Sequence, residues 1–121
     1  MESNKFELTG RVNFKDFANS KSGKAVAKIL LSKRKANGDN VEFQSYNITF
    51  FGDVAEKTKS IEKGDLVHVE GVFSTSKFEK DGKQVERMQL LGNDFQFIEY
   101  DEKSKAYKVI EKVTDDELPF D

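Results

Sequence analysis

The sequence contains no cysteine and no tryptophan, and it has one proline and one histidine among 121 residues. The lack of cysteine excludes a disulfide framework, a catalytic thiolate and a zinc site with sulfur ligands. No apolar stretch approaches the ~20 residues that a membrane span needs, and the N-terminus lacks the apolar segment of a signal peptide. We therefore expect a soluble protein of the cytoplasm that makes no membrane contact.

Side chains that catalysis needs are also scarce. His68 is the only histidine, and it alternates with Val67 and Val69 as in a strand, where a lone histidine is more often structural than catalytic. The eight glycines are dispersed and form no phosphate-binding loop. Asp115 and Asp116 are adjacent but lie near the chain end, where nothing would hold them in catalytic geometry. We expect no enzymatic activity, no cofactor and no metal site.

The charges, by contrast, are plentiful and unevenly distributed. Residues 1–98 carry 16 Lys and Arg against 14 Asp and Glu, whereas residues 99–121 carry 4 against 8. A basic cluster lies between residues 15 and 35. A weakly basic body with an acidic end is typical of a polyanion-binding protein that recruits other proteins through that end. On composition alone, a solvated surface without a partner would account for the basic cluster equally well.

Alternation of polar and apolar residues predicts several strands. They cover residues 5–14, 25–32, 41–51, 65–74 and 84–91, and residues 93–100 could add one more. Asn37-Gly38 and Asp81-Gly82 predict tight turns, and residues 15–24 and 33–40 are expected to be loops. Asp53 and Glu56 resemble a capping box at the start of a short helix that would end at Gly64.

This order of elements predicts an all-β fold. Three strands, a helix and two more strands are the order of a five-stranded Greek-key barrel of the OB type, with one short helix between strands 3 and 4. We assign residues 1–100 to this barrel and residues 101–121 to an acidic C-terminal tail. Leu30 would face outward, which indicates a subunit contact. The residues expected to face the core are Phe6, Leu8, Val12, Phe14, Ala27, Ile29, Leu31, Tyr46, Ile48, Phe50, Val67, Val69 and Phe73.

Binding of single-stranded nucleic acid is better supported than catalysis. Such binding combines cations that contact phosphates with aromatic faces that stack on bases. Phe43 and Phe51 share a polar face of the third predicted strand, and Phe78 lies among lysines. Each could instead pack against the core or a hairpin stem. The candidate phosphate contacts are basic residues of the strands and loops: Arg11, Lys28, Lys33, Arg34, Lys35, Lys77, Lys80 and Lys83.

The end of the sequence combines acidic residues with an aromatic residue. It reads Asp115, Asp116, Glu117, Leu118, Pro119, Phe120 and Asp121. Like charges keep such a segment extended, and the proline blocks a helix. The segment is suited to a basic pocket on another protein, although a solvated tail without a role would look the same.

These features together resemble the single-stranded DNA-binding proteins of bacteria and their phages. The most specific match is Lys63-Gly64-Asp65-Leu66-Val67-His68-Val69-Glu70-Gly71. Residues 22–27, 46–52 and 54–56 resemble the second strand, the third strand and the helix start of that family, and residues 115–120 resemble its acidic tip. The resemblance implies an OB-fold, a homo-oligomer that is commonly a tetramer, and sequence-independent binding of single-stranded DNA in replication, recombination and repair. It also implies stacking roles for Phe51 and Phe78 and recruitment of partner enzymes by the tip.

The sequence departs from the family pattern in several places. Ser45 and the loop around Lys35 lack aromatic residues that the family usually has there, which predicts weaker or more salt-sensitive binding. Phe43 lies on the same face as Ser45 and is placed to compensate. The long linker before the tip is missing, and Asp121 follows Phe120, which makes tail recruitment less secure than DNA binding. The compact format resembles a phage-encoded version.

Other functions remain open at this stage. The main alternative is an OB-fold protein-interaction module, such as a primosome-like subunit, with weak nucleic-acid binding. An RNA-binding OB domain is a further possibility, but the acidic tip argues against it. An enzyme is disfavoured because no nucleophile or general base is evident.

Overall fold

The computed structural model describes residues 3–19 and 21–111, and strands make up most of that part of the chain. The elements, in chain order, are β1 (Phe6–Asn19), β2 (Ala25–Asn37), β3 (Asn40–Phe51), α1 (Asp53–Lys57), the 3-10 helix η1 (Thr58–Ser60), β4 (Leu66–Lys80), β5 (Lys83–Asp101) and β6 (Ala106–Ile110).

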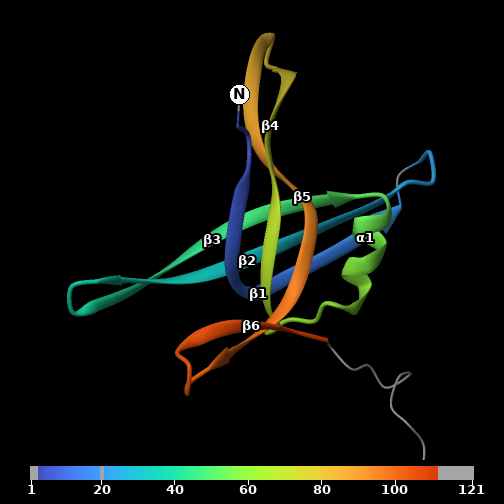
Figure 1. Cartoon of the computed structure of the whole chain (residues 1–121). Coiled ribbons are helices and arrows are strands. Elements are labelled where there is room, and N and C mark those ends of the chain that lie inside the picture. The colour runs from blue at the N-terminus through green and yellow to red at the C-terminus, as the bar shows by residue number, and fades with distance from the viewer. Residues whose placement is uncertain (1–2, 20, 112–121) are drawn as a thin grey trace, which may run out of the picture.

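The strands of the described residues form one sheet in the order β3-β2-β1-β4-β5-β6. Neighbours in this order are antiparallel. A short parallel pairing, in which Ile48 and Thr49 lie opposite Leu90 and Leu91, joins β3 to β5. The first five strands in this order therefore close into a barrel, and α1 follows β3 at one end of it (Figure 1). This confirms the predicted OB-type barrel with its single short helix between the third and fourth strands.

The barrel interior follows the predicted alternation closely. Residues of β2 and β3 that were expected to face inward are fully buried, with Ala27, Ile29, Leu31, Ile48 and Phe50 all at 0% exposure. Burial of these apolar side chains supplies the main stabilisation of the fold. The inward positions of Phe6, Val12, Val67 and Val69 are confirmed as well, whereas Leu8 and Tyr46 are half-buried.

The predicted helix is shorter than expected, and its predicted cap is wrong. The N-cap residue is Gly52, no side chain caps the helix, and the backbone N–H of Glu56 donates to the carbonyl of Gly52. The positive φ of 68° at Gly52 gives the chain its entry into α1. After η1, Lys15 reaches over from β1, and its Nζ donates to the carbonyl of Ile61 at 2.6 Å. This hydrogen bond satisfies the carbonyl of Ile61 directly after η1, before the predicted end of the helix at Gly64.

Several predicted loops are strands. β1 continues to Asn19 and β2 to Asn37, because the two strands of each hairpin remain paired well beyond the barrel wall. The turns after Asn37 and at Asp81-Gly82 are confirmed. Residues 93–100 continue β5 instead of forming a separate strand, after a register shift opposite Glu70 and Gly71.

Two residues that were expected in the core face outward. Phe14 is 58% exposed because the register shifts between Val12 and Phe14, and the extra residue, Asn13, reverses the alternation of β1 from that point on. Phe73 is 41% exposed and contacts the edge of the Phe6 ring, with 5.8 Å between ring centroids. The prediction of an inward Phe14 and Phe73 was therefore wrong.

The sheet continues into the segment that was assigned to the tail. β6 pairs with the end of β5, and Tyr107 packs edge-to-face on Tyr100 with 5.2 Å between centroids. The acidic tip, residues 115–120, lies outside the described residues. Within residues 3–19 and 21–111, no helix has the length and apolar character needed to cross a membrane.

Candidate nucleic-acid interface

The register between β2 and β3 places the predicted binding residues on one outward face. Residues directly opposite each other in an antiparallel pair share a face of the sheet. Arg34 lies opposite Phe43, Lys28 opposite Thr49, and Val26 opposite Phe51. The pairs between them are Ser32 with Ser45 and Leu30 with Asn47. Along both strands these five pairs alternate with pairs of inward-facing residues, such as Ile29 with Ile48. The five pairs therefore form a row of side chains that faces away from the barrel interior.

This outward face carries exposed aromatic rings among polar residues. Phe43 is 72% exposed and Phe51 is 52% exposed, although both are large apolar side chains. They are eight residues apart in one strand, a separation of about 26 Å at ~3.3 Å per residue. An OB fold contacts ~4–16 nucleotides, so two rings at this spacing can contact different bases of one strand. The core alternative for Phe43 and Phe51 is excluded by their exposure.

Cations lie next to both rings. Arg34 is the direct cross-strand neighbour of Phe43, and Lys28 is a diagonal neighbour of Phe51 through Thr49. Both cations are exposed. Asp16 of β1 lies opposite Lys28 on its other side, so one carboxylate borders this otherwise basic row.

The reversed alternation of β1 adds a third aromatic ring to the same face. Phe14 lies opposite Leu30, which in turn lies opposite Asn47. Leu30 is itself a member of this row and is half-buried. Phe14 therefore belongs with the outward residues of β2 and β3, and it is a candidate stacking residue that the sequence did not predict.

The β4–β5 hairpin carries the second part of the site. Phe78 lies opposite Val85, and the same face carries Lys80 opposite Lys83 and Ser76 opposite Arg87. Phe78 is 39% exposed, and the guanidinium carbon of Arg87 lies 5.8 Å from the centroid of its ring. At this distance Arg87 contacts the Phe78 face as a cation–π partner. The Phe78 ring therefore packs against Arg87 of the same hairpin and remains partly exposed to solvent.

Other candidate cations are placed differently. Lys33 and Lys35 lie opposite Gln44 and Glu42, on the face of the β2–β3 hairpin away from Phe43. Lys77 lies opposite Glu86, on the face of the β4–β5 hairpin away from Phe78. Arg11 is exposed, but its guanidinium donates to the carbonyl of Gly64 at 3.0 Å, which ties it to the loop before β4.

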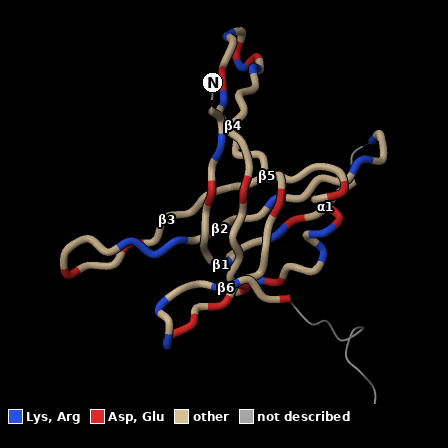
Figure 2. The backbone as a smooth tube through the Cα atoms, viewed as in Figure 1, with Lys and Arg blue, Asp and Glu red and all other residues tan. Residues whose placement is uncertain are grey.

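The two hairpins leave the barrel from a common point. Since β3 and β5 run parallel where they pair, their preceding segments, 40–47 and 83–89, depart from the same end of that pairing. They then diverge as two arms of the molecule (Figure 1). Lysines and arginines mark both arms in Figure 2. A single extended polyanion could therefore pass from one arm to the other across the barrel.

Comparison with known proteins shows the family of this chain. The model of the single-strand binding protein family matches residues 3–98. This chain belongs to the single-strand binding protein family. Within the family it is similar to single-stranded DNA-binding protein 2 of Streptococcus agalactiae serotype III, with 31% identity over 101 residues that cover 79% of this chain and 77% of that protein. A serotype V protein of the same name is 30% identical over the same length.

Solved structures of single-strand binding proteins share the fold. The single-stranded DNA binding protein from Thermus aquaticus superposes with a TM-score of 0.69 and 24% identity, over 80% of this chain and 50% of the Thermus chain. The present chain thus spans about half of the length of that relative. The Plasmodium falciparum SSB in complex with ssDNA superposes with a TM-score of 0.64 and 21% identity, over 78% of this chain and 92% of that chain.

Arg87 and Phe14 are the outward residues that sequence reasoning missed. Arg87 could have been found, because the Asp81-Gly82 turn fixes the hairpin register and hence the pairing of Ser76 with Arg87. Phe14 could not, because its position depends on an extra residue at Asn13 that no turn or glycine marks.

Proposed function

We propose that this protein binds single-stranded DNA without sequence preference, along the outward face of β1–β3 and along the β4–β5 arm. The proposed stacking residues are Phe14, Phe43, Phe51 and Phe78. The proposed phosphate contacts are Lys28, Arg34, Lys80, Lys83 and Arg87. Arg11 lies at the margin of this surface. The remaining candidates point to the opposite faces of the arms and are not among the proposed contacts: Lys33, Lys35 and Lys77.

One observation supports this function above the others: exposed aromatic rings and cations lie side by side on one face of the sheet. Arg34 with Phe43, and Lys28 near Phe51, place a phosphate contact beside a stacking surface at two points of the same strand pair. Stacking on a ring face needs an unpaired base, so these rings favour single strands over duplex.

The wider role follows from the family and from the sequence. Protection of single strands in replication, recombination and repair, in the cytoplasm, is the function we propose, with assembly into a homotetramer. The acidic tip, residues 115–120, would recruit replication and recombination proteins by presenting carboxylates and Phe120 to a basic pocket. Neither role requires a cofactor or catalysis.

Fluorescence anisotropy with labelled oligothymidine and a matching duplex tests the DNA-binding function. We expect tight binding to the single strand that weakens with salt, and little binding to the duplex. Phe43→Ala and Phe51→Ala should each lower the affinity by about 5- to 150-fold, since stacking contributes ~1–3 kcal/mol per base. Both rings are exposed, so neither variant should unfold the barrel.

Tyr107→Ala is the matched control. Tyr107 is an equally exposed aromatic residue, at 58%, but it lies on β6, outside the proposed face. Its removal should leave DNA affinity unchanged. Equal effects of all three substitutions, or no binding of oligothymidine at low salt, would refute the proposed interface and favour protein recruitment as the main function.

A further inference from the structure

The outer face of β1, β4 and β5 carries a row of carboxylates that the DNA-binding function does not use. Glu7 lies directly opposite Glu70, and Glu70 lies directly opposite Asp94 on the next strand. Acidic segments of these three strands lie side by side in Figure 2. Like charges directly opposite each other in a sheet destabilise the pair. A cation bound against such a row would reduce this repulsion.

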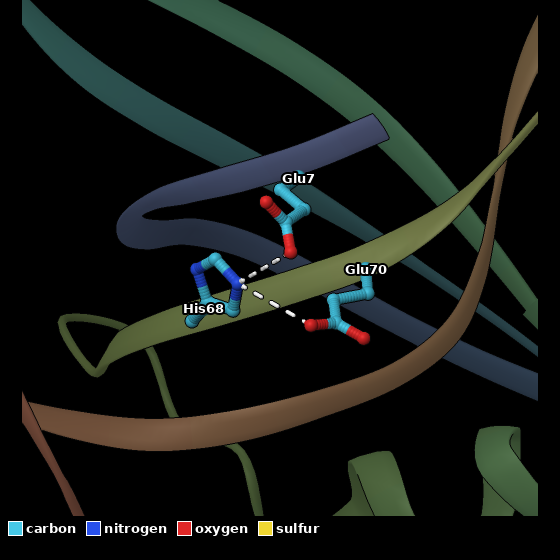
Figure 3. Close-up of side chains that lie close together, drawn as sticks. All are labelled: Glu7, His68 and Glu70. Atoms are coloured by element: carbon cyan, nitrogen blue, oxygen red, sulfur yellow. Dashed lines mark ion pairs between the residues drawn. The ribbon is translucent and has the colours of Figure 1, made fainter. Parts of the chain in front are cut away.

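A histidine lies within this row. The Nε2 atom of His68 lies 3.9 Å from Glu7 Oε1 and 3.8 Å from Glu70 Oε1. The three donor atoms all lie within 4.8 Å of one another. Figure 3 shows the imidazole with one nitrogen directed toward both carboxylates. The side chain of His68 is 27% exposed, compared with 50% and 47% for those of Glu7 and Glu70, so the nitrogen donor is the most fixed of the three.

The orientation of the imidazole is set by a second contact. Thr9 lies opposite His68, and its Oγ1 is 2.8 Å from His68 Nδ1. When Nδ1–H donates to this hydroxyl, the lone pair of Nε2 faces the carboxylates. Histidines that bind metals usually donate their other ring N–H in this way, which fixes the tautomer and the ring orientation.

We infer that Glu7, His68 and Glu70 form a binding site for a divalent transition-metal ion, with zinc as its best representative. One imidazole nitrogen and two carboxylates are a donor set that suits Zn²⁺ better than Mg²⁺ or Ca²⁺, which prefer oxygen ligands alone. The inference concerns residues that are not among the proposed DNA-binding residues, and it does not depend on the proposed function.

The geometry fits such an ion after a small closure. Ligands at ~2.1 Å from a tetrahedral zinc ion are about 3.4 Å apart. The two carboxylates therefore need to approach Nε2 by about half an ångström, and each other by up to ~1.4 Å. Both are half-exposed side chains that can make this movement. Lys5 Nζ lies 3.5 Å from Glu7 Oε1 and would move aside.

There is also room for a further ligand. His68, Glu70 and Asp94 line a hollow of about 40 Å³, together with Phe95 and Gln96. A water molecule needs ~10–15 Å³ of such space. A water held between the ion and Asp94 could therefore complete the coordination. The ion would connect β1 to β4 and offset the repulsion within the carboxylate row.

Isothermal titration of the full chain with Zn²⁺ tests the inference, with each ligand replaced in turn. We expect His68→Gln, Glu7→Gln and Glu70→Gln each to weaken zinc binding at least tenfold. Glu79→Gln is the matched control, because Glu79 is an exposed glutamate on the same strand as Glu70 but lies outside the row. The acidic end of the chain is present in every variant, so any zinc that it binds contributes equally.

Two further readouts separate a metal site from a simple ion pair. Thr9→Val keeps all three ligands and should weaken zinc binding ~10–100-fold, as expected for loss of an outer-shell partner. Co²⁺ bound to the wild-type chain should give visible absorption bands that His68→Gln lacks. Circular dichroism of the metal-free variants checks that each is folded.

The outcomes are decisive in both directions. Weakened binding in His68→Gln and in at least one of the two carboxylate variants supports the site. Identical titrations for the wild type and His68→Gln would overturn it, leaving an ion-paired histidine. Loss in His68→Gln alone, with both carboxylate variants unchanged, would overturn the three-ligand arrangement.

Discussion

Two neighbouring cations of the β2–β3 arm should differ in their contribution to DNA binding. Arg34 shares the outward face with Phe43, whereas Lys35 is the next residue along the strand and points to the opposite face, across from Glu42. Both are exposed, so replacing either with glutamine removes one positive charge at little cost to the fold. If DNA follows the face that carries the aromatic rings, only Arg34→Gln should weaken the electrostatic part of binding.

The size of this effect follows from the number of phosphates contacted. Binding to a single strand changes log K by about −0.7 per contacted phosphate for each unit of log salt concentration. Five contacts, from Lys28, Arg34, Lys80, Lys83 and Arg87, give a slope of about −3.5, which is about a hundredfold loss of affinity between ~50 and ~200 mM salt. Arg34→Gln should change the slope to about −2.8, and Lys35→Gln should leave it unaltered.

Anisotropy titrations of oligothymidine at several salt concentrations measure these slopes directly. Both variants carry the same net charge, so a general electrostatic attraction would affect them equally. Equal slopes for the two variants would refute the assignment of the binding face from the strand register. A larger effect of Lys35→Gln would place the DNA on the opposite face of the arm.

Two further predictions follow from the structure and the sequence. Phe14→Ala should weaken binding to oligothymidine. It should lower the free energy of unfolding by less than the ~3–5 kcal/mol that is typical of a buried phenylalanine. A loss of ~3–5 kcal/mol in urea denaturation would place Phe14 in the core. Deletion of residues 112–121 should raise DNA affinity at low salt, because the acidic tip competes with DNA for the cations of the body; equal affinity of the truncated and complete chains would contradict this competition.

The fold could be predicted because its determinants are local. Alternation over residues 25–32 and 41–51 gave the buried faces of β2 and β3, and the glycine-containing turns placed both hairpins. The outward position of Phe43 and Phe51 followed from the same alternation. These predictions succeeded because side-chain period and turn chemistry act over a few residues and do not depend on the rest of the chain.

Features set by tertiary contacts could not be predicted in the same way. Lys15 donates to the carbonyls of Lys59 and Ile61, which lie more than 40 residues away in the segment after α1, and no local pattern predicts this contact. The approach of Glu7 to His68 depends on the pairing of β1 with β4, although each residue was visible in the sequence as an ordinary polar position. Alternation in the sequence places Glu70 on the same face of β4 as His68, whereas only the pairing of β1 with β4 brings Glu7 to that face.

The extra residue at Asn13 links the two surfaces of the protein. Before it, the outward residues of β1 are Glu7 and Thr9, which face His68 and Glu70 of β4. After it, the outward positions shift by one residue, and Phe14 joins the face formed with β2 and β3. An unbroken alternation would have directed Phe14 into the barrel and moved Lys15 away from the carbonyls at the end of η1. A single bulge thus allows one strand to contribute to a carboxylate–histidine cluster at one end and to the proposed base-stacking surface at the other, without either set of side chains entering the core.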